Sequence, residues 1–486
     1  MIQMNFESVK LFLANKTLVL LLIFASIALR WNSIRYPSTI DWDENTFLVV
    51  ASESAKGNFP YTTTFENKSP LSMLPQTLLM IIGVNDLRFF RIVAAILLGL
   101  AAYALALAQQ DLHKVGKFLV GILFIYLFSS ISSGLAWISE LNIILLFASV
   151  FYLVLNSKWN SSYQAIRIGF LIGLIPLTRA NWSFVALVLF GYTLIRLPTW
   201  RQRLRFITAT IAPSFLIFLL YLFNGNLKNL LQGFVLLPMA ITKQFQNYQF
   251  PIDSVLISLV IFLLIILTKL NKTKTQDLSM LSWLSIAIIL SLFFSAPDYS
   301  HHLTQLSPML ALSFGAFLRS FSKSALRQIS VGVVLLFMIV ISIQSMSSMR
   351  ISLSNLEVPD AKKRMMRELS LVSEVRALGL PKSTTFMALD EHYLYWRLGF
   401  LPPEPLLTHP ALFFVDSAFY VFYPKETKVN GVDHIFKVKP RIVVESGLRW
   451  MDEINRNRTY EYLKDSYVVE KSVSNSPQIN VWVLKQ

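Results

Sequence analysis

The chain has 486 residues, of which 54% are hydrophobic and 15% are charged, and its mean hydropathy is +0.53. This composition excludes an ordinary soluble domain and predicts a polytopic membrane protein. The formal charge of +16 does not indicate a nucleic-acid partner, because the cations lie mainly in short gaps between apolar runs, as the positive-inside rule expects. The absence of cysteine excludes disulfides, thiolate metal sites and thiol catalysis.

Apolar runs that approach the roughly 17 to 25 residues of a membrane-spanning helix recur between residues 17 and 346. A shorter run, 71–83, contains Pro75, so we expect an interfacial or re-entrant segment there rather than a span. The eleven predicted spans are 17–32, 88–108, 117–134, 139–156, 165–178, 182–197, 206–224, 253–269, 278–296, 303–318 and 328–346.

The distribution of Lys and Arg between these runs supports the count. With the N-terminus in the cytoplasm, every inside loop after the first span carries at least two cations, whereas the outside loops carry few. If 71–83 were counted as a span, every later loop would be assigned to the opposite side of the membrane, and the cation-rich loops would lie outside. The sequence therefore predicts a first loop, 33–87, and a C-terminus that both lie outside the cytoplasm.

The pattern changes after the last apolar run. Residues 359–378 have the periodicity of an amphipathic helix, and four short strand-like runs follow it. We therefore expect an all-α membrane domain of about eleven helices over 1–349 and a small extracytoplasmic α/β domain over 350–486. The expected strands are 385–389, 441–445, 467–473 and 479–484.

The first outer loop is the most acidic segment of this basic chain. Asp43 and Glu44 begin a predicted short helix that runs to Lys56 and ends at Gly57. A carboxylate in the first turn is stabilised as an anion by the helix dipole, so Asp43 is expected to be ionised and able to accept a proton or bind a cation. The alternative is that Asp41 or Asp43 only caps this helix.

Lys68 lies near the end of the same loop, immediately before Ser69-Pro70. Pro70 favours an extended backbone at Ser69, which leads the chain into the interfacial segment. A cation at the membrane surface is suited to bind a lipid phosphate. A Lys that only anchors the loop at the membrane surface would have the same sequence, and both interpretations stay open at this point.

Three elements of this loop, in this order, resemble the C-type glycosyltransferases that use polyprenyl-phosphate sugars. They are Asp43-Glu44, the turn Gly57-Asn-Phe-Pro-Tyr61, and Lys68-Ser-Pro-Leu71, in which Ser69 replaces the proline of the family's Lys-Pro-Pro-Leu. The branches that the chain resembles most are the lipid A aminoarabinose transferase, the core galacturonosyl transferases and the protein O-mannosyltransferases. Weaker similarities, at residues 88–98, 173–181 and 301–308, extend the resemblance over about residues 15 to 345.

The resemblance implies an enzyme of a bacterial inner membrane with its active site on the extracytoplasmic face. It would transfer a sugar from a polyprenyl-phosphate donor to a glycolipid, polysaccharide or protein acceptor by direct displacement with inversion. Asp43 would be the base and Glu44 its partner. Lys68, Arg179 and His301 would bind the leaving phosphate, although an isolated Arg or His at a helix end can equally be an interface anchor.

Two further carboxylates are expected to contact substrate. Glu66 lies in the first loop, and Glu140 begins the run 139–156, where it could bind the acceptor, a sugar hydroxyl or a divalent cation. The alternative for Glu140 is a helix-start Glu that compensates the dipole. No cofactor is otherwise expected, but Asp41-Trp-Asp43 has the spacing of an Asp-x-Asp metal site, so a divalent cation stays an alternative.

Two other classes of membrane protein compete with this interpretation. A polymerase or ligase of lipid-linked oligosaccharides would also be polytopic and basic, but such enzymes usually have their catalytic loop late in the chain. A transporter would have ionisable residues in the middle of its spans, and the predicted spans contain almost none.

Overall fold

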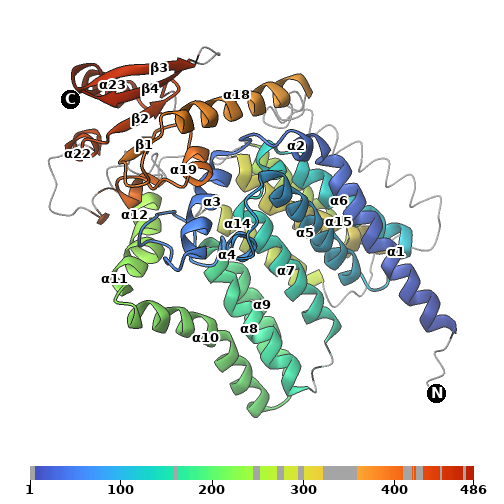
Figure 1. Cartoon of the computed structure of the whole chain (residues 1–486). Helices are drawn as coiled ribbons and strands as arrows, with labels where there is room; N and C mark the ends of the chain where they lie inside the picture. The colour runs from blue at the N-terminus through green and yellow to red at the C-terminus, as the bar shows by residue number, and fades with distance from the viewer. Residues whose placement is uncertain are drawn as a thin grey trace. The chain divides into compact units, whose positions relative to one another are not determined.

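The computed structural model is predominantly helical, with one small sheet near the C-terminus (Figure 1). The predicted eleventh span, 328–346, lies outside the residues that the structure describes. Those residues are 6–157, 159, 161–244, 252–270, 278–293, 300–320, 358–408, 419, 421–422, 431–448, 451–473 and 478–485. Contacts divide the chain into two compact units, the first of residues 1–35, 86–217 and 248–358, the second of residues 36–85, 218–247 and 359–486.

The first unit contains most of the apolar helices, and each of the first ten predicted spans falls on a helix. Three described helices, α5, α7 and α10, are long and apolar enough to cross a membrane, and several shorter apolar helices accompany them. The helices of this unit are α1 (Phe6–Leu29), α2 (Trp31–Arg35), α5 (Leu87–Ala108), α6 (Lys114–Ser129), α7 (Ser139–Asn156), α8 (Ser162–Thr178), α9 (Ser183–Arg196), α10 (Trp200–Phe223), α13 (Ile252–Leu270), α14 (Leu278–Phe293) and α15 (Ser307–Ser320). Short 3-10 turns are η1 (Ser132–Leu135), η2 (Ala180–Trp182) and η4 (Ser300–Leu306).

Close packing in this unit depends on small side chains, as is usual between membrane helices. A Cβ at Gly99 of α5 would lie only 2.7 Å from the Cα of Ile23 in α1, so these two backbones meet at a position that tolerates only glycine. By contrast, α10 leaves Phe215, Leu216 and Phe223 largely exposed. A soluble protein rarely exposes such a face, whereas contact with lipid accounts for it.

The second unit combines the first loop, the segment after α10 and the C-terminal residues. Its helices are α3 (Trp42–Ala55), α4 (Leu74–Ile81), α11 (Leu227–Leu230), the π-helical turn η3 (Leu231–Leu236), α12 (Leu237–Gln244), α18 (Val358–Ala377), α19 (Tyr393–Leu398), the 3-10 turn η5 (Pro405–Thr408), α22 (Gly431–Lys437) and α23 (Glu453–Ser466). Helix α4 lies within the run 71–83, and its 8 residues extend only about 12 Å, too short to cross a bilayer.

The sheet has the order β1-β2-β4-β3, with β1 parallel to β2 and the other pairs antiparallel. Its strands are β1 (Phe386–Ala388), β2 (Ile442–Glu445), β3 (Tyr467–Val473) and β4 (Ile479–Leu484), so each predicted strand is present. Residues of β1, β2 and β4 form a hydrophobic core with α18 and α19, and Val49 of α3 belongs to that core. The first loop is thus packed into the C-terminal fold by its own helix.

Candidate active site

The predicted helix at the start of the first loop is confirmed as α3, and its N-cap is Asp41. Asp41 has an extended backbone (φ −128°, ψ 136°), and its carboxylate accepts a hydrogen bond of 2.9 Å from the Asp43 amide. The helix ends at Ala55 with Lys56 as its C-cap, and Gly57 follows in the left-handed region at φ +96°. Because Asp41 caps the helix, the carboxylate of Asp43 does not serve as the cap.

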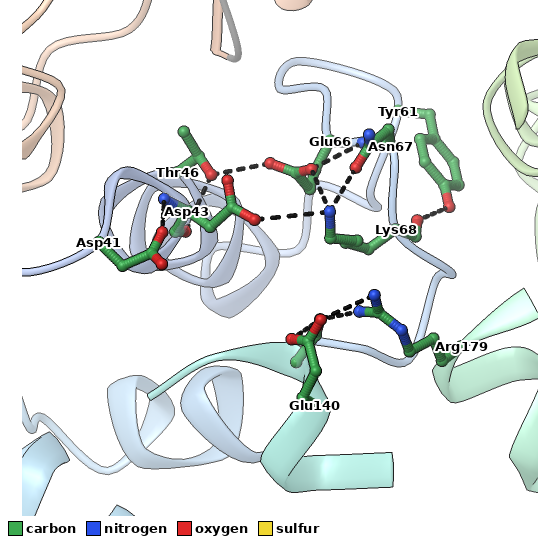
Figure 2. A network of polar contacts seen from close by, with 10 residues as sticks. Asp41, Asp43, Thr46, Tyr61, Glu66, Asn67, Lys68, Glu140 and Arg179 are labelled. Atoms are coloured by element: carbon green, nitrogen blue, oxygen red, sulfur yellow. Dashed lines mark hydrogen bonds and ion pairs between the residues drawn. The ribbon is translucent and has the colours of Figure 1, made fainter. Parts of the chain in front are cut away.

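The structure brings together Asp43, Glu66 and Lys68, three of the predicted site residues (Figure 2). The Lys68 ammonium lies 3.5 Å from Asp43 Oδ2 and 4.0 Å from Glu66 Oε1, and it donates to Asn67 Oδ1 at 2.9 Å. The side chains of Lys68 and Asp43 are 11% and 15% exposed. A cation and a carboxylate are therefore held together in a mostly buried position.

Glu66 has a different environment from Asp43. Its carboxylate accepts hydrogen bonds from the Thr46 hydroxyl at 2.7 Å and from the Asn67 amide at 2.9 Å, and the residue is 2% exposed. Glu66 thus ties α3 to the segment that carries Lys68. Glu44, the expected partner of Asp43, lies in the first turn of α3 with its side chain buried.

The turn Gly57-Asn-Phe-Pro-Tyr61 fixes the backbone of Lys68. Tyr61 has φ +68°, which few residues other than glycine adopt, and its amide donates to the Thr64 carbonyl at 2.9 Å. The Tyr61 hydroxyl donates to the carbonyl oxygen of Lys68, and Gly233 packs directly against the ring. Burial, with the nearby Tyr221 and Glu66, raises the pKa of Tyr61 well above its usual value, so the phenol stays a donor.

In the first unit, Glu140 and Arg179 form an ion pair (Figure 2). Arg179 Nη2 lies 2.7 Å from Glu140 Oε1, and Nη1 donates to the Ser139 hydroxyl at 2.6 Å. The Ser139 hydroxyl donates in turn to Glu140 Oε2 at 3.1 Å. Glu140 lies in the first turn of α7 and Arg179 directly after α8, and their side chains are 1% and 6% exposed. So little exposure does not fit an Arg that only anchors a helix at a surface.

Two further expectations concern His301 and a metal site. His301 lies in η4, but its side chain is outside the part of the chain that the structure describes. Among the described residues, no group of three or more His, Asp or Glu side chains is arranged to hold a metal ion. Of the Asp-x-Asp pair, only the Asp41 carboxylate caps α3, through the Asp43 amide.

Three residues of these contacts were not predicted from the sequence: Thr46, Asn67 and Ser139. Thr46 follows Asp43 by one helical turn, so the helix periodicity could have placed it on the same face. Asn67 precedes Lys68 directly, but asparagine in a loop carries no specific signal. Ser139 acts between two helices, and local sequence gives no indication of such a contact.

No family model matches the sequence, and a search of curated proteins finds no match. The structure is similar to the crystal structure of ArnT from Cupriavidus metallidurans in the apo state, with a TM-score of 0.60 and 13% identity over 96% of this chain and 98% of that chain. Two crystal structures of the oligosaccharyltransferase from Archaeoglobus fulgidus also match, each with a TM-score of 0.49 over 97% of this chain and 74% of that chain. The identity is 12% for the apo form and 11% for the form tethered to an acceptor peptide.

At 13% identity, the ArnT match concerns the fold. It extends over nearly the whole chain and agrees with the apolar helices and the C-terminal sheet. The chain is therefore a multi-pass membrane protein with the fold of ArnT, and this fold agrees with the resemblance seen in the first-loop motifs.

Proposed function

We propose that this protein is an integral membrane glycosyltransferase that moves one sugar from a polyprenyl-phosphate donor to an acceptor outside the cytoplasm. The observation that carries the proposal is the pairing of Asp43 with Lys68, at 3.5 Å, in a chain with the ArnT fold. An inverting displacement needs a carboxylate that takes a proton and a fixed cation that faces the leaving phosphate. The first loop supplies both kinds of group.

In the proposed reaction, the acceptor hydroxyl oxygen attacks the anomeric carbon while the bond from that carbon to the phosphate oxygen breaks. The hydroxyl proton passes to the Asp43 carboxylate, and the polyprenyl phosphate leaves as an anion. The Lys68 ammonium stabilises the charge that develops on this phosphate. Its position is set by Asn67 and Glu66, and the N-terminus of α3 favours the ionised form of Asp43.

Arg179 and Glu140 are proposed to bind substrate in the first unit. Arg179 offers a planar guanidinium suited to a phosphate, and Glu140 can accept hydrogen bonds from sugar hydroxyls. Their mutual ion pair and the Ser139 contacts fix both side chains. His301 stays a proposed phosphate ligand and Glu44 a proposed partner of the base, both by resemblance to the family.

The extracytoplasmic position of the site and the inner-membrane location are also part of the proposal. They are supported by the loop cations, which the positive-inside rule assigns to the cytoplasm.

The test is transfer by the purified protein in lipid nanodiscs. The protein is incubated with radiolabelled polyprenyl-phosphate sugars and with membranes as the source of acceptor, and the label is followed into lipid, glycan and protein fractions. Transfer of a single sugar that Asp43→Asn lowers to a small residual rate supports the proposal. Transfer of a preassembled oligosaccharide would favour a polymerase or ligase. Sugar uptake into proteoliposomes that contain the purified protein, without transfer, would favour a transporter.

A further inference from the structure

Helix α3 presents two neighbouring faces to two different parts of the second unit. Trp42, Asn45 and Val49 follow one another at helical spacing and lie on one face. Asp43 and Thr46 lie on the next face, about 100° further around the helix. This second face meets Lys68 and Glu66. The contacts of the first face therefore determine how α3 is rotated, and with it where Asp43 points.

The first face is bound by residues of the C-terminal fold. The Trp42 indole N–H donates to the His392 ring nitrogen Nδ1, and the two ring centroids are 4.7 Å apart. The Trp396 indole N–H donates to Asn45 Oδ1 at 3.2 Å. His392 is the N-cap residue of α19, and Trp396 lies one turn further along the same helix.

Two further contacts hold α3 at its start and along its length. Just before the helix, the Thr39 amide donates to Glu368 Oε1 of α18 at 2.6 Å. Further along, Val49 is 2% exposed and lies in the hydrophobic core with Leu371 and Phe386. Polar contacts therefore fix the beginning of α3, and apolar burial fixes its middle.

Helix α19 is itself held firmly. The Tyr395 hydroxyl accepts a hydrogen bond of 2.8 Å from the Ala388 amide at the end of β1, and Tyr395 is fully buried. His392 is 1% exposed. The side chains that contact α3 thus come from a rigid, packed element, as accurate positioning requires.

We propose that the C-terminal fold is a positioning part of the active site. His392 and Trp396 set the rotation of α3 through Trp42 and Asn45, and so direct Asp43 toward Lys68. The inference rests on the proposed function in that it treats Asp43 as the base. Displacement of a catalytic group by about 1 Å can lower a rate roughly 100-fold, so the loss of these contacts should impair transfer.

The test uses single substitutions in the full chain. His392→Phe keeps an aromatic ring and removes the acceptor, and Trp396→Phe removes the donor. We expect kcat to fall roughly tenfold to 100-fold while the KM for donor stays unchanged. His392→Asn, which restores an acceptor near the position of Nδ1, should recover most of the rate. Tyr462→Phe is the matched control, because it removes a 2.9 Å hydrogen bond to Asp433 elsewhere in the C-terminal fold.

Two measurements separate positioning from general loss of stability. In the Asp43→Asn background, His392→Phe should cause no further loss, because its effect passes through Asp43. Hydrogen exchange of the α3 amides should be faster in His392→Phe than in Tyr462→Phe. A further loss in the Asp43→Asn background, or equal exchange in the two variants, would overturn the inference. If the wild-type protein transfers no sugar, the proposed function fails, and the exchange data alone still decide whether His392 holds α3.

Discussion

The Lys68 ammonium lies 3.5 Å from Asp43 Oδ2, and Asp43 also lies in the first turn of α3. Both the cation and the exposed amides of the helix N-terminus favour the ionised carboxylate. The same ammonium can stabilise the phosphate that leaves as Asp43 takes a proton. One ion pair thus connects the two groups that the proposed displacement requires.

Asp43→Asn should lower transfer to a small residual rate. The substitution is nearly isosteric but removes the proton acceptor, and loss of a positioned base typically costs roughly 100 to 10,000-fold. The measurement is single-turnover transfer by the purified variant, with donor binding determined separately. Asp41→Asn is the control: Asn caps a helix about as well as Asp, so this variant should keep its activity and its unfolding temperature. A rate above about a tenth of wild type in Asp43→Asn would exclude Asp43 as the base.

Lys68→Ala should weaken the use of donor, and Lys68→Arg should be partly tolerated. Alanine removes the cation from beside Asp43 and Glu66, whereas arginine keeps the charge in a different shape. The measurement is the KM for donor together with direct donor binding.

Lys56→Ala is the control for Lys68, because Lys56 also pairs with a carboxylate of α3, Glu53, at 2.5 Å. Its side chain is 55% exposed, and such surface pairs contribute little. If Lys68→Ala and Lys56→Ala change donor binding equally, Lys68 only anchors the loop and does not bind the donor phosphate.

Local patterns predicted much of this fold, because helices, caps and strands leave local signals. The acidic first turn and Gly57 predicted the bounds of α3 within about a residue, and each predicted strand of the C-terminal sheet is present. Spacing alone could not decide whether Asp41 or Asp43 caps α3. That choice depends on which residue leaves the helical conformation, and the extended backbone of Asp41 decides it.

Contacts between distant segments could not be predicted in this way. Glu140 and Arg179 each had a local interpretation, as a helix-start acid and as a terminal cation, and neither predicts their 2.7 Å ion pair. Likewise, no local pattern connects Trp42 with His392. These contacts depend on how helices pack, which a single sequence encodes only through the whole fold.

Single and double substitutions of Glu140 and Arg179 should show whether their ion pair acts in stability, in function or in both. Removing one partner of a buried ion pair leaves the other charge uncompensated and typically costs about 3 to 5 kcal/mol. Glu140→Gln should therefore lower the unfolding temperature, and the double variant Glu140→Gln, Arg179→Gln should recover part of it. The double variant should still use donor poorly. Recovery of full activity together with stability would show that the pair is only structural.

The topology predicts which introduced cysteines react with a membrane-impermeant maleimide in intact cells. The cysteine-free chain is a clean background. Lys56→Cys in the first loop and Glu470→Cys in β3 should both be labelled, because the positive-inside rule predicts that both segments lie outside the cytoplasm. Arg201→Cys, in an inside loop, should react only after the membrane is opened. Labelling of only one of the first two would exclude the eleven-span topology.

Glu391, next to His392, should make the stability of the protein depend on pH. Burial, with smaller contributions from Glu368 and Asp390, raises its pKa from 4.5 to about 7, although Arg367 at 2.8 Å and a hydrogen bond with Ser446 act in the opposite direction. Because the pKa is raised in the folded state, protonated Glu391 contributes favourably to the free energy of unfolding. This contribution is complete below about pH 4.5 and is lost as the pH rises through 7.

This pKa shift corresponds to about 3 kcal/mol between the two limits. The wild-type unfolding temperature should therefore fall between pH 5 and pH 8. The unfolding temperature of Glu391→Gln should fall less, because glutamine cannot ionise. Glu453→Gln, which alters an exposed carboxyl in the first turn of α23, should follow the wild type. The measurement is thermal unfolding of the purified full chain in detergent at both pH values. Equal falls in the wild type and in Glu391→Gln would contradict the prediction, because the ionisation of Glu391 would then contribute nothing to the pH dependence.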